Sequence, residues 1–423
     1  MSQYDSMSRE ELLIAKNNAQ SAYDLYMEKK LSLNMARGKP NFKQLDISLD
    51  MFDIKDYIAE GNLDCRNYGV LDGIDEAKEL FSKVIDVPVD CVFVGGNSSL
   101  NLMYDVIARA MTHGMYNSEK PWCKYDEIKF LCITPGYDRH FAICEHFGIK
   151  MINVPMKNDG PDMDIIDRLV ENDDTIKGIW CVPKYSNPQG ITYSDAVVKR
   201  FAALNPKAKD FRIFWDEAYI VHDLDINDCD VLLPIYDECL KNNNEDLPLI
   251  FASTSKISFG GAGVAVMGMS QQNIAYAKKL MAVQTIGFDK INQLRHVKYF
   301  KNYDGIINHM KKHAQIIKPK FDIVINALND EIKPLGIGSW HNPKGGYFIC
   351  FDTEKGCAKR VIELCDKCGV VMTPAGSTYP YHNDPDDTNI RIAPTFPTED
   401  ELKLAMQVFC VCVKLATLEK LLG

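Results

Sequence analysis

Short apolar runs alternate with helix-like segments from residue 73 to residue 270. Seven runs are apolar along most of their length, at 91–94, 128–133, 151–154, 178–182, 212–215, 249–252 and 264–267. Strands that are apolar on both sides are typical of a parallel sheet with helices on both faces. The pattern therefore predicts an α/β fold, with a large domain whose mostly parallel seven-stranded sheet is covered by helices.

The two ends of the chain have a different pattern. The first 30 residues predict one amphipathic helix, which Ser8 opens with a capping-box sequence. Strand signals at 345–351, 370–373 and 389–393 alternate with helical segments at 356–368 and from 398 onward. This mixture favours a smaller α+β domain built from both chain ends. We expect its N-terminal arm and helix over 1–50, the large domain over 51–300, and the C-terminal part of the small domain over 301–423.

Composition and charge exclude several classes of protein. The 423 residues are 46% hydrophobic and 25% charged, as in an ordinary soluble globular chain. The formal net charge is −10 without a basic block, which argues against a nucleic-acid partner. No apolar run approaches the roughly 18 residues of a membrane span, and the N-terminus lacks the pattern of a secretory signal. We therefore expect a cytoplasmic protein with no membrane partner.

Cysteine and histidine spacings give little support to a metal site. The 14 cysteines are scattered through apolar segments, which is typical of reduced thiols used as small hydrophobic side chains. Cys365 and Cys368 form a lone C-x-x-C without the second pair that a structural zinc site needs. His309 and His313 are four residues apart, but two lysines lie between them, and we expect a solvated helix face. No metal site is predicted.

Five loops that follow predicted strands carry polar or aromatic side chains, and ligands of parallel sheets bind at such loops. They are Gly-Gly-Asn-Ser-Ser at 95–99, Thr-Pro-Gly-Tyr-Asp-Arg-His at 134–140, Tyr-Ser-Asn-Pro-Gln-Gly at 185–190, Asp-Glu-Ala-Tyr at 216–219, and the Ser-, Thr- and Gly-rich segment 253–263 around Lys256. Each loop alone also has a purely structural explanation: a helix cap, a packed ring, a tight turn or an internal salt bridge.

Together the loops meet the needs of one cofactor. The turn at 95–99 precedes a helix and offers N–H groups and hydroxyls to an anion, and Tyr137 offers a flat ring. Asp216 ends a buried strand, where a carboxylate is costly unless it pairs with a group such as a protonated ring nitrogen. Lys256 lies between two apolar strands, and desolvation would lower its pKa and make the amine a nucleophile. The set matches pyridoxal 5'-phosphate (PLP).

At these residues the sequence resembles the fold-type I PLP-dependent aminotransferases. Within that group it is similar to an atypical bacterial aspartate aminotransferase-like branch, whose N-terminal loop reads Ala-Arg-Gly-Lys-Pro, here at 36–40. The resemblance extends from Leu33 to Phe396, with the motifs in the family order. It implies transfer of an amino group from an amino acid, expected to be aspartate, to a 2-oxo acid, expected to be 2-oxoglutarate, through a PLP Schiff base on Lys256.

The resemblance also implies roles for individual residues. Lys256, Asp216 and Tyr219 would be catalytic: Lys256 carries the cofactor, Asp216 binds the pyridinium nitrogen, and Tyr219 binds the ring 3′-oxygen together with Asn187. Tyr137 would stack on the ring. The remaining cofactor contacts, most of them to the phosphate, fall to Gly96, Asn97, Ser98, Ser99, Ser253 and Ser255.

Further roles concern the substrate and a second subunit. Gly38 and Arg391 match positions that receive the substrate α-carboxylate, next to Asn187. Tyr68 matches a tyrosine that reaches the phosphate of the neighbouring subunit, which implies a homodimer with shared active sites. The family also suggests cis peptide bonds before Pro135 and Pro188.

One position departs from the family pattern. Many relatives place an arginine eight residues beyond the Schiff-base lysine, where it pairs with the cofactor phosphate, and this chain has Val264. A cation for a substrate side-chain carboxylate is also unassigned, and each candidate is by default a solvated surface charge. The candidates are Arg37, Lys39, Arg139, Lys184 and Arg295.

Two other functions stay open at this level. The same cofactor loops would serve a PLP-dependent aminotransferase or lyase acting on another amino acid, aromatic or other, because residues of the substrate pocket decide between them. A transcriptional regulator with an aminotransferase-like ligand-sensing domain is a remote alternative. Such proteins carry a DNA-binding module ahead of that domain, whereas about 30 residues precede the shared pattern in this acidic chain.

Overall fold

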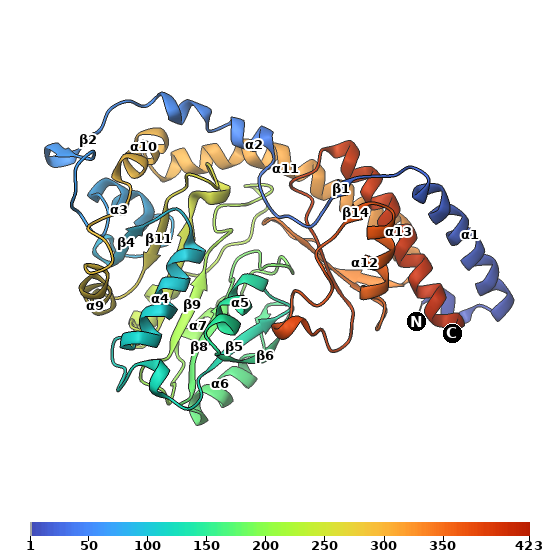
Figure 1. Cartoon of the computed structure of the whole chain (residues 1–423), viewed down its shortest axis with the longest axis horizontal. Coiled ribbons are helices and arrows are strands. Elements are labelled where there is room, and N and C mark those ends of the chain that lie inside the picture. The colour runs from blue at the N-terminus through green and yellow to red at the C-terminus, as the bar shows by residue number, and fades with distance from the viewer. Residues whose placement is uncertain (1) are drawn as a thin grey trace.

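The computed structural model describes residues 2–423, and an eight-stranded sheet forms its larger unit (Figure 1). The strands, given in chain order, are β4 (Val92–Gly95), β5 (Lys129–Thr134), β6 (Lys150–Lys157), β7 (Gly160–Pro161), β8 (Ile176–Cys181), β9 (Arg212–Asp216), β10 (Pro248–Ser253) and β11 (Ala265–Gly268). Their order in the sheet is β4-β11-β10-β9-β8-β5-β6-β7. All seven predicted strands are present, and the eighth, β7, has two residues.

Most neighbouring strands of this sheet run parallel, as the sequence predicts. The pairs β6–β5, β5–β8, β8–β9 and β9–β10 are parallel, whereas β11 is antiparallel to both β10 and β4. The carboxyl ends of β5, β8, β9 and β10 therefore meet at one edge of the sheet, where the loops that follow them lie side by side.

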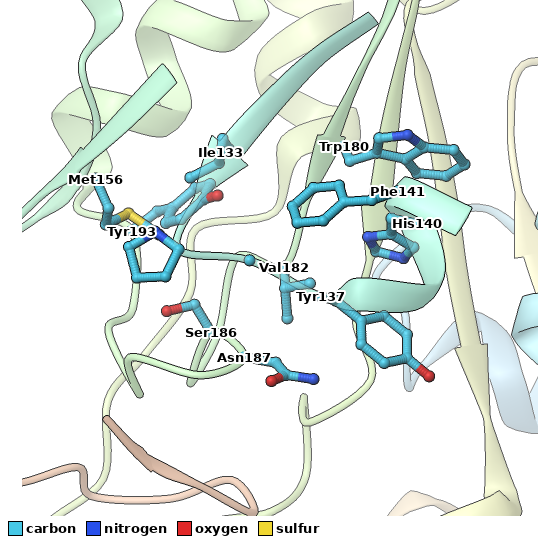
Figure 2. A pocket seen from close by; sticks show the side chains of 12 residues that line it. Ile133, Tyr137, His140, Phe141, Met156, Trp180, Val182, Ser186, Asn187 and Tyr193 are labelled. Atoms are coloured by element: carbon cyan, nitrogen blue, oxygen red, sulfur yellow. The ribbon is translucent and has the colours of Figure 1, made fainter. Parts of the chain in front are cut away.

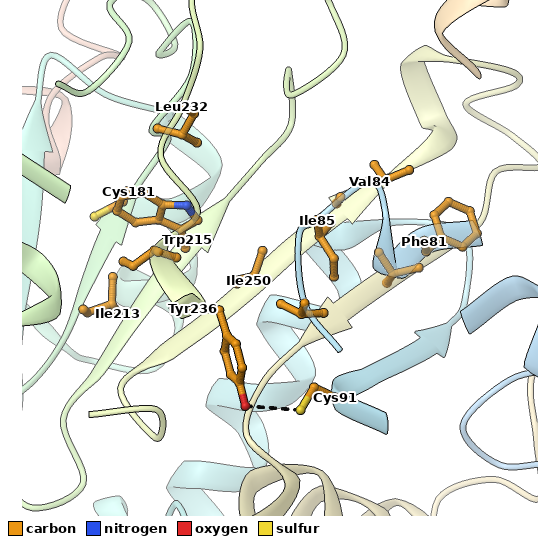
Figure 3. Close-up of a cluster of buried hydrophobic side chains, with 14 of the residues drawn as sticks. Phe81, Val84, Ile85, Cys91, Cys181, Ile213, Trp215, Leu232, Tyr236 and Ile250 are labelled. Atoms are coloured by element: carbon orange, nitrogen blue, oxygen red, sulfur yellow. Dashed lines mark hydrogen bonds between the residues drawn. The ribbon is translucent and has the colours of Figure 1, made fainter. Parts of the chain in front are cut away.

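Helices cover both faces because successive side chains of each buried strand point to opposite sides. One face packs against α3 (Asp75–Ser82), α6 (Met163–Asn172), α7 (Asp195–Ala202), α8 (Ile235–Lys241) and α10 (Lys290–Phe300). The other packs against α4 (Ser99–His113), α5 (Asp138–His146) and α9 (Gln271–Met281). Figure 3 shows part of the first core, where Trp215 and Ile213 of β9 lie near Tyr236, whose hydroxyl is 3.2 Å from Cys91 Sγ.

Both ends of the chain build the smaller unit. Its sheet has the antiparallel order β12-β13-β15, with β12 (Gly338–Trp340), β13 (Ile349–Thr353) and β15 (Asn389–Ile392). The helices α1 (Arg9–Met27), α11 (Tyr303–Glu331), α12 (Ala358–Lys367) and α13 (Glu399–Leu422) pack with it. The predicted capping box of α1 is present, and α1 lies beside α13, which brings the termini together (Figure 1).

Short elements complete the chain. β1 (Leu33–Asn34) pairs in parallel with β14 (Val370–Val371), which joins the N-terminal arm to the C-terminal part. The arm continues through α2 (Phe42–Asp46) and a two-stranded ribbon of β2 (Ile58–Ala59) and β3 (Leu63–Asp64). The smaller α+β unit is confirmed, whereas domain boundaries at residues 50 and 300 stay a prediction.

Two expectations about exposure were wrong. His309 and His313 are buried on α11, at 4% and 1% exposure, because they share its inner face with Ile306, Met310 and Ile317. The two lysines between them lie on the opposite, exposed face. Lys184 is also buried rather than a surface charge.

All 14 cysteines are free, and Cys365 and Cys368 are buried in the core of the smaller unit. Across residues 2–423, no helix combines the length and the apolar character that crossing a membrane requires. The expected cytoplasmic location stays a prediction.

Candidate active site

A cavity of about 240 Å³ opens at the carboxyl ends of the parallel strands. It gathers residues from all five loops that the sequence singles out. Nine of the predicted site residues line it: Ser98, Ser99, Tyr137, Asn187, Asp216, Tyr219, Ser253, Ser255 and Lys256. The loops that supply them are far apart in the chain but in direct contact: Ser255 Oγ donates to the backbone oxygen of Asn97, 158 positions earlier, at 3.0 Å.

The sheet register explains why an acid and an amine share this cavity. Phe251 of β10 pairs with Asp216, the last residue of β9, so the two strands end at the same level. A 3₁₀ turn, Thr254–Lys256, follows β10 directly and carries Lys256 over that edge. Adjacent parallel strands thus place Asp216 and Lys256 on one rim.

Asp216 is a buried carboxylate with one partner. It is 2% exposed, and its Oδ2 accepts a hydrogen bond from His140 Nε2 at 3.2 Å. Its Oδ1 is buried and has no hydrogen-bond partner among residues 2–423. A buried carboxylate oxygen without a donor is costly, so the site is built to receive a hydrogen-bond donor or a cation at that atom.

His140 is a site residue that the sequence analysis missed. Its ring is buried, stacks on Trp180 at 4.5 Å between centroids, and meets Tyr137 edge-on at 4.9 Å. Figure 2 shows these three rings beside a smaller cavity that shares Tyr137 and Asn187 with the main one. The available signal was its place in the first turn of α5, three residues after Tyr137, but such a histidine has no fixed partner until the fold places Asp216 beside it.

Lys256 lies beside the ring of Tyr219. Its Nζ is 4.9 Å from the centre of the Tyr219 ring. Burial lowers the pKa of the Lys256 amine, while the charge of Asp216 acts in the opposite direction. Burial also raises the pKa of Tyr219, so its hydroxyl stays protonated. A lysine of this kind is more readily available as a free amine than a surface lysine, as the sequence predicts.

Hydroxyl groups also line the cavity. Ser253 Oγ donates to Ser255 Oγ at 3.1 Å, and Ser98 precedes α4, which begins at Ser99. The N-terminus of that 15-residue helix adds its free N–H groups. Gly96 and Asn97 belong to the same loop but do not line the cavity.

Arg391, Asn187 and Gly38 come together at the side of the cavity. Arg391 is buried, and its Nη1 donates to Asn187 Oδ1 at 3.3 Å. Its guanidinium carbon lies 4.6 Å from the centre of the Phe348 ring. A Cβ on Gly38 would fall 2.1 Å from Phe348 Cζ, so a larger residue there would displace the ring that contacts Arg391.

The structure places other predicted residues elsewhere. Tyr68 is 83% exposed and lies outside the cavity of its own chain. Val264 is a core residue whose N–H donates to Thr254 Oγ1 at 2.8 Å. Lys184 pairs with Asp223 at 2.8 Å.

The other candidate cations for a substrate side-chain carboxylate lie outside the main cavity. Arg37 and Arg139 are exposed, Lys39 Nζ lies 4.1 Å from the centre of the Phe396 ring, and Arg295 lies near the ring of Phe52. The bonds before Pro135 and Pro188 are cis, as the resemblance suggests.

Comparison with known proteins decides the family. The family model described as aspartate amino-transferase matches residues 7–423. The chain belongs to the aspartate aminotransferase family. This aminotransferase is 44% identical to a putative aminotransferase of Mycolicibacterium smegmatis over 99% of both chains. It is 41% identical to an aspartate aminotransferase of Corynebacterium glutamicum, covering 94% of this chain and 92% of that one.

Solved structures agree with this assignment. The crystal structure of an aspartate transaminase from Corynebacterium glutamicum has a TM-score of 0.96 to this aminotransferase, with 39% identity and 99% of both chains covered. An α-aminoadipate aminotransferase from Thermus thermophilus, at 16% identity and a TM-score of 0.73, shares the fold. The resemblance and the α/β fold of the sequence analysis are confirmed, and the protein is an aspartate-aminotransferase-like enzyme that transfers amino groups.

The family implies PLP, and the residues of this cavity fit it. The unpartnered Oδ1 of Asp216 can accept the N–H of a protonated pyridine ring, and the Lys256 amine lies on the same rim. Hydroxyls and a helix N-terminus at the serine-lined side suit a phosphate. The match rests on the chemistry of the donors as well as on family membership.

Proposed function

We propose that this aminotransferase moves the amino group of aspartate to 2-oxoglutarate, with PLP held as a Schiff base on Lys256. The observation that carries the proposal is the cavity that joins the Lys256 amine to the half-partnered carboxylate of Asp216. The choice of aspartate rests on the Corynebacterium glutamicum relative, which is named an aspartate aminotransferase. The choice of 2-oxoglutarate as acceptor rests on the family resemblance alone.

Each side of the cavity would hold one part of the cofactor. Asp216 Oδ1 would accept the ring N–H while His140 keeps Oδ2 in place. Tyr219 and Asn187 would bind the 3′-oxygen, and Tyr137 would cover one ring face. The serine hydroxyls of Ser98, Ser99, Ser253 and Ser255, with Gly96 and Asn97 in the adjoining loop, would surround the phosphate.

Proton transfer would fall to Lys256. When bound, the cofactor supplies a cationic ring that draws electrons from the substrate Cα. The Lys256 amine, once free, would take the Cα proton at Nζ and deliver it to the cofactor carbon that is joined to the amino nitrogen. Its lowered pKa keeps a larger fraction of the amine unprotonated and able to act as a base. Asp216 keeps the ring nitrogen protonated.

Arg391 would receive the substrate α-carboxylate, with Asn187 and Gly38 beside it. Its buried Nε has no partner, and a guanidinium matches a carboxylate in a paired, planar geometry. For a side-chain carboxylate, Lys184 is already paired with Asp223, so Arg37, Lys39, Arg139 and Arg295 stay candidates.

We also propose a homodimer with shared active sites. Tyr68 is exposed together with Val283 and Ile286, two apolar residues near the loop at Gly287, which packs against Gly69. Exposed apolar groups of this kind are typical of an interface between subunits. Tyr68 would reach the phosphate site of the second subunit.

One alternative keeps the cofactor and changes the substrate. An aminotransferase or lyase acting on an aromatic or other amino acid would use the same cofactor contacts, so a panel of amino acids with detection of each 2-oxo acid separates the cases. The sensor domain of a regulator is disfavoured, because this chain matches the Mycolicibacterium smegmatis aminotransferase over 99% of both lengths.

The proposal is tested by spectroscopy and by product analysis. Purified protein with added PLP should show a visible absorbance band, which Lys256→Ala loses and Lys279→Ala, on an exposed control lysine, keeps. Aspartate should yield oxaloacetate over many turnovers only when 2-oxoglutarate is present, and at most about one oxaloacetate per active site without it. A colourless wild type, or sustained oxaloacetate formation without an acceptor, would contradict the proposal.

A further inference from the structure

Arg391 forms an ion pair with Asp138 that links the two units of the molecule. Its Nη1 lies 3.1 Å from Asp138 Oδ1, and the two side chains are 8% and 27% exposed. Asp138 is the first residue of α5, on the large sheet, whereas Arg391 is on β15 of the small sheet. The pair therefore fixes the arginine of the substrate site to a helix of the opposite unit.

The donors of Arg391 show which part of the guanidinium stays available. Nη1 donates to Asp138 and Asn187, and Nη2 donates to Thr373 Oγ1 at 3.4 Å. The guanidinium has five N–H groups, so Nε–H and a second Nη2 hydrogen remain, and Nε is buried without a partner. Nε and Nη2 lie along one edge, and such an edge binds a carboxylate through two parallel hydrogen bonds.

Asp138 also changes the charge that a substrate meets. A carboxylate 3.1 Å from the guanidinium largely balances its positive charge. The Phe348 ring on its face and Thr373 on Nη2 add no charge. An incoming carboxylate would therefore be held by oriented hydrogen bonds rather than by a net positive field.

We propose that Asp138 is a positioning residue for Arg391 and a determinant of substrate affinity. It holds Nη1 so that the Nε–Nη2 edge of Arg391 can bind the substrate α-carboxylate. Its negative charge also weakens the attraction of Arg391 for the α-carboxylates of both the amino acid and the 2-oxo acid. This inference rests on the proposed role of Arg391 in receiving that carboxylate. A bound product leaves more readily from such a site than from an unbalanced arginine.

Asp138→Asn separates charge from hydrogen bonding, because asparagine still offers an oxygen to Nη1. We expect KM for aspartate and for 2-oxoglutarate to fall roughly five- to tenfold, with a smaller change in kcat. We also expect KM to rise more steeply with NaCl, between about 20 and about 200 mM, than in the wild type. A merely structural residue would not change this salt dependence.

Two further variants serve as controls. Asp138→Glu keeps the charge and should retain the weak salt dependence of the wild type, which also tests the idea if Asp138→Asn does not fold. Asp195→Asn removes the exposed carboxylate of the first residue of another helix, α7, and should leave both KM values unchanged.

The outcomes separate the role of Asp138 from the proposed aspartate aminotransferase activity on which it rests. A wild type that forms no oxaloacetate from aspartate and 2-oxoglutarate overturns both. An active wild type with unchanged or higher KM values in Asp138→Asn, and unchanged salt dependence, overturns the role of Asp138 alone. A wild-type KM that already rises severalfold with salt does the same.

Discussion

Asp216 shows how single residues make this site reactive. A carboxylate that is 2% exposed needs compensation, and His140 supplies it at one oxygen only. The ring of His140 is in turn fixed by Trp180 and Tyr137. Its Nε2 must be the protonated nitrogen, because a carboxylate oxygen can only accept. The histidine thus fixes the orientation of the acid and leaves Oδ1 directed to a ligand.

Replacing His140 should therefore leave the Asp216 carboxylate in the site but without the hydrogen bond that orients it. In His140→Ala we expect kcat/KM for aspartate to fall roughly ten- to hundredfold, because the buried Asp216 loses its only donor. PLP should also bind more weakly, which titration of the visible absorbance measures. His146→Ala, at the exposed end of the same helix, is the matched control. Equal kinetics in the two variants would contradict the positioning role.

At the scale of elements, α11 connects the smaller unit to the lysine segment. His309 Nε2 donates to the backbone oxygen of Ile257 at 2.9 Å, next to Lys256. His313 lies 3.1 Å from His309 and the same distance from Gln44 of α2, whose side chain also donates to Tyr347 at 3.0 Å. Tyr347 donates to the backbone oxygen of Lys256. His309 of α11 and Tyr347 thus hold the turn that carries Lys256, and Gln44 of α2 supports both through its contacts with His313 and Tyr347.

This buried network predicts a pH dependence of stability. Burial, the largest cause, lowers the pKa of His313 to about 3, below the value of about 6.5 in an unfolded chain. Between these values the unfolded state binds a proton that the folded state excludes, so the free energy of unfolding falls as pH falls below about 6.5. The urea midpoint of the wild type should therefore be lower at about pH 5 than at about pH 7.5.

His313→Gln should show a smaller decrease over the same pH range, because it lacks the titrating group. His382→Gln, on an exposed histidine, should decrease as the wild type does. If His313→Gln and His382→Gln lose the same amount of stability on acidification, His313 is not the group responsible.

At the scale of the whole molecule, the site depends on parts that are far apart in the chain. The N-terminal arm supplies Gly38, the large sheet supplies Asp216 and Lys256, and β15 supplies Arg391. Tyr68 is exposed, and in the proposed homodimer it would contribute to the site of a second copy of the chain. Loss of the contact between copies would then affect catalysis as well as assembly.

Coexpression of two inactive variants tests shared sites directly. Tyr68→Ala and Lys256→Ala should each have low activity alone. A randomly assembled mixture of the two should regain about a quarter of wild-type activity, because about half of its dimers are hybrids and one of the two sites in each hybrid is intact. Size-exclusion chromatography checks that the variants remain dimers. Activity no higher than the sum of the separate variants would show that Tyr68 acts within its own subunit or not at all.

Much of the fold could be predicted from local signals. The strands of the large sheet are apolar on both sides, and their residues carry that signal regardless of the neighbours they meet. Asp216 and Lys256 also have local signals, since Asp216 directly follows an apolar run and Lys256 lies among small polar residues between two apolar strands. The predicted roles of the site residues stay predictions, although the cavity brings nine of them together.

The sequence by itself determined the alternation of strands and helices and the loops that carry the acid and the amine, because these depend on the polarity of consecutive residues. Only the tertiary structure decided which side chains pair, His140 with Asp216 and Asp138 with Arg391. It also decided that His309 and His313 are buried. Such contacts join residues as much as 253 positions apart. Neither burial nor charge pairing has a local signal, since both depend on which distant surfaces the packed core brings together.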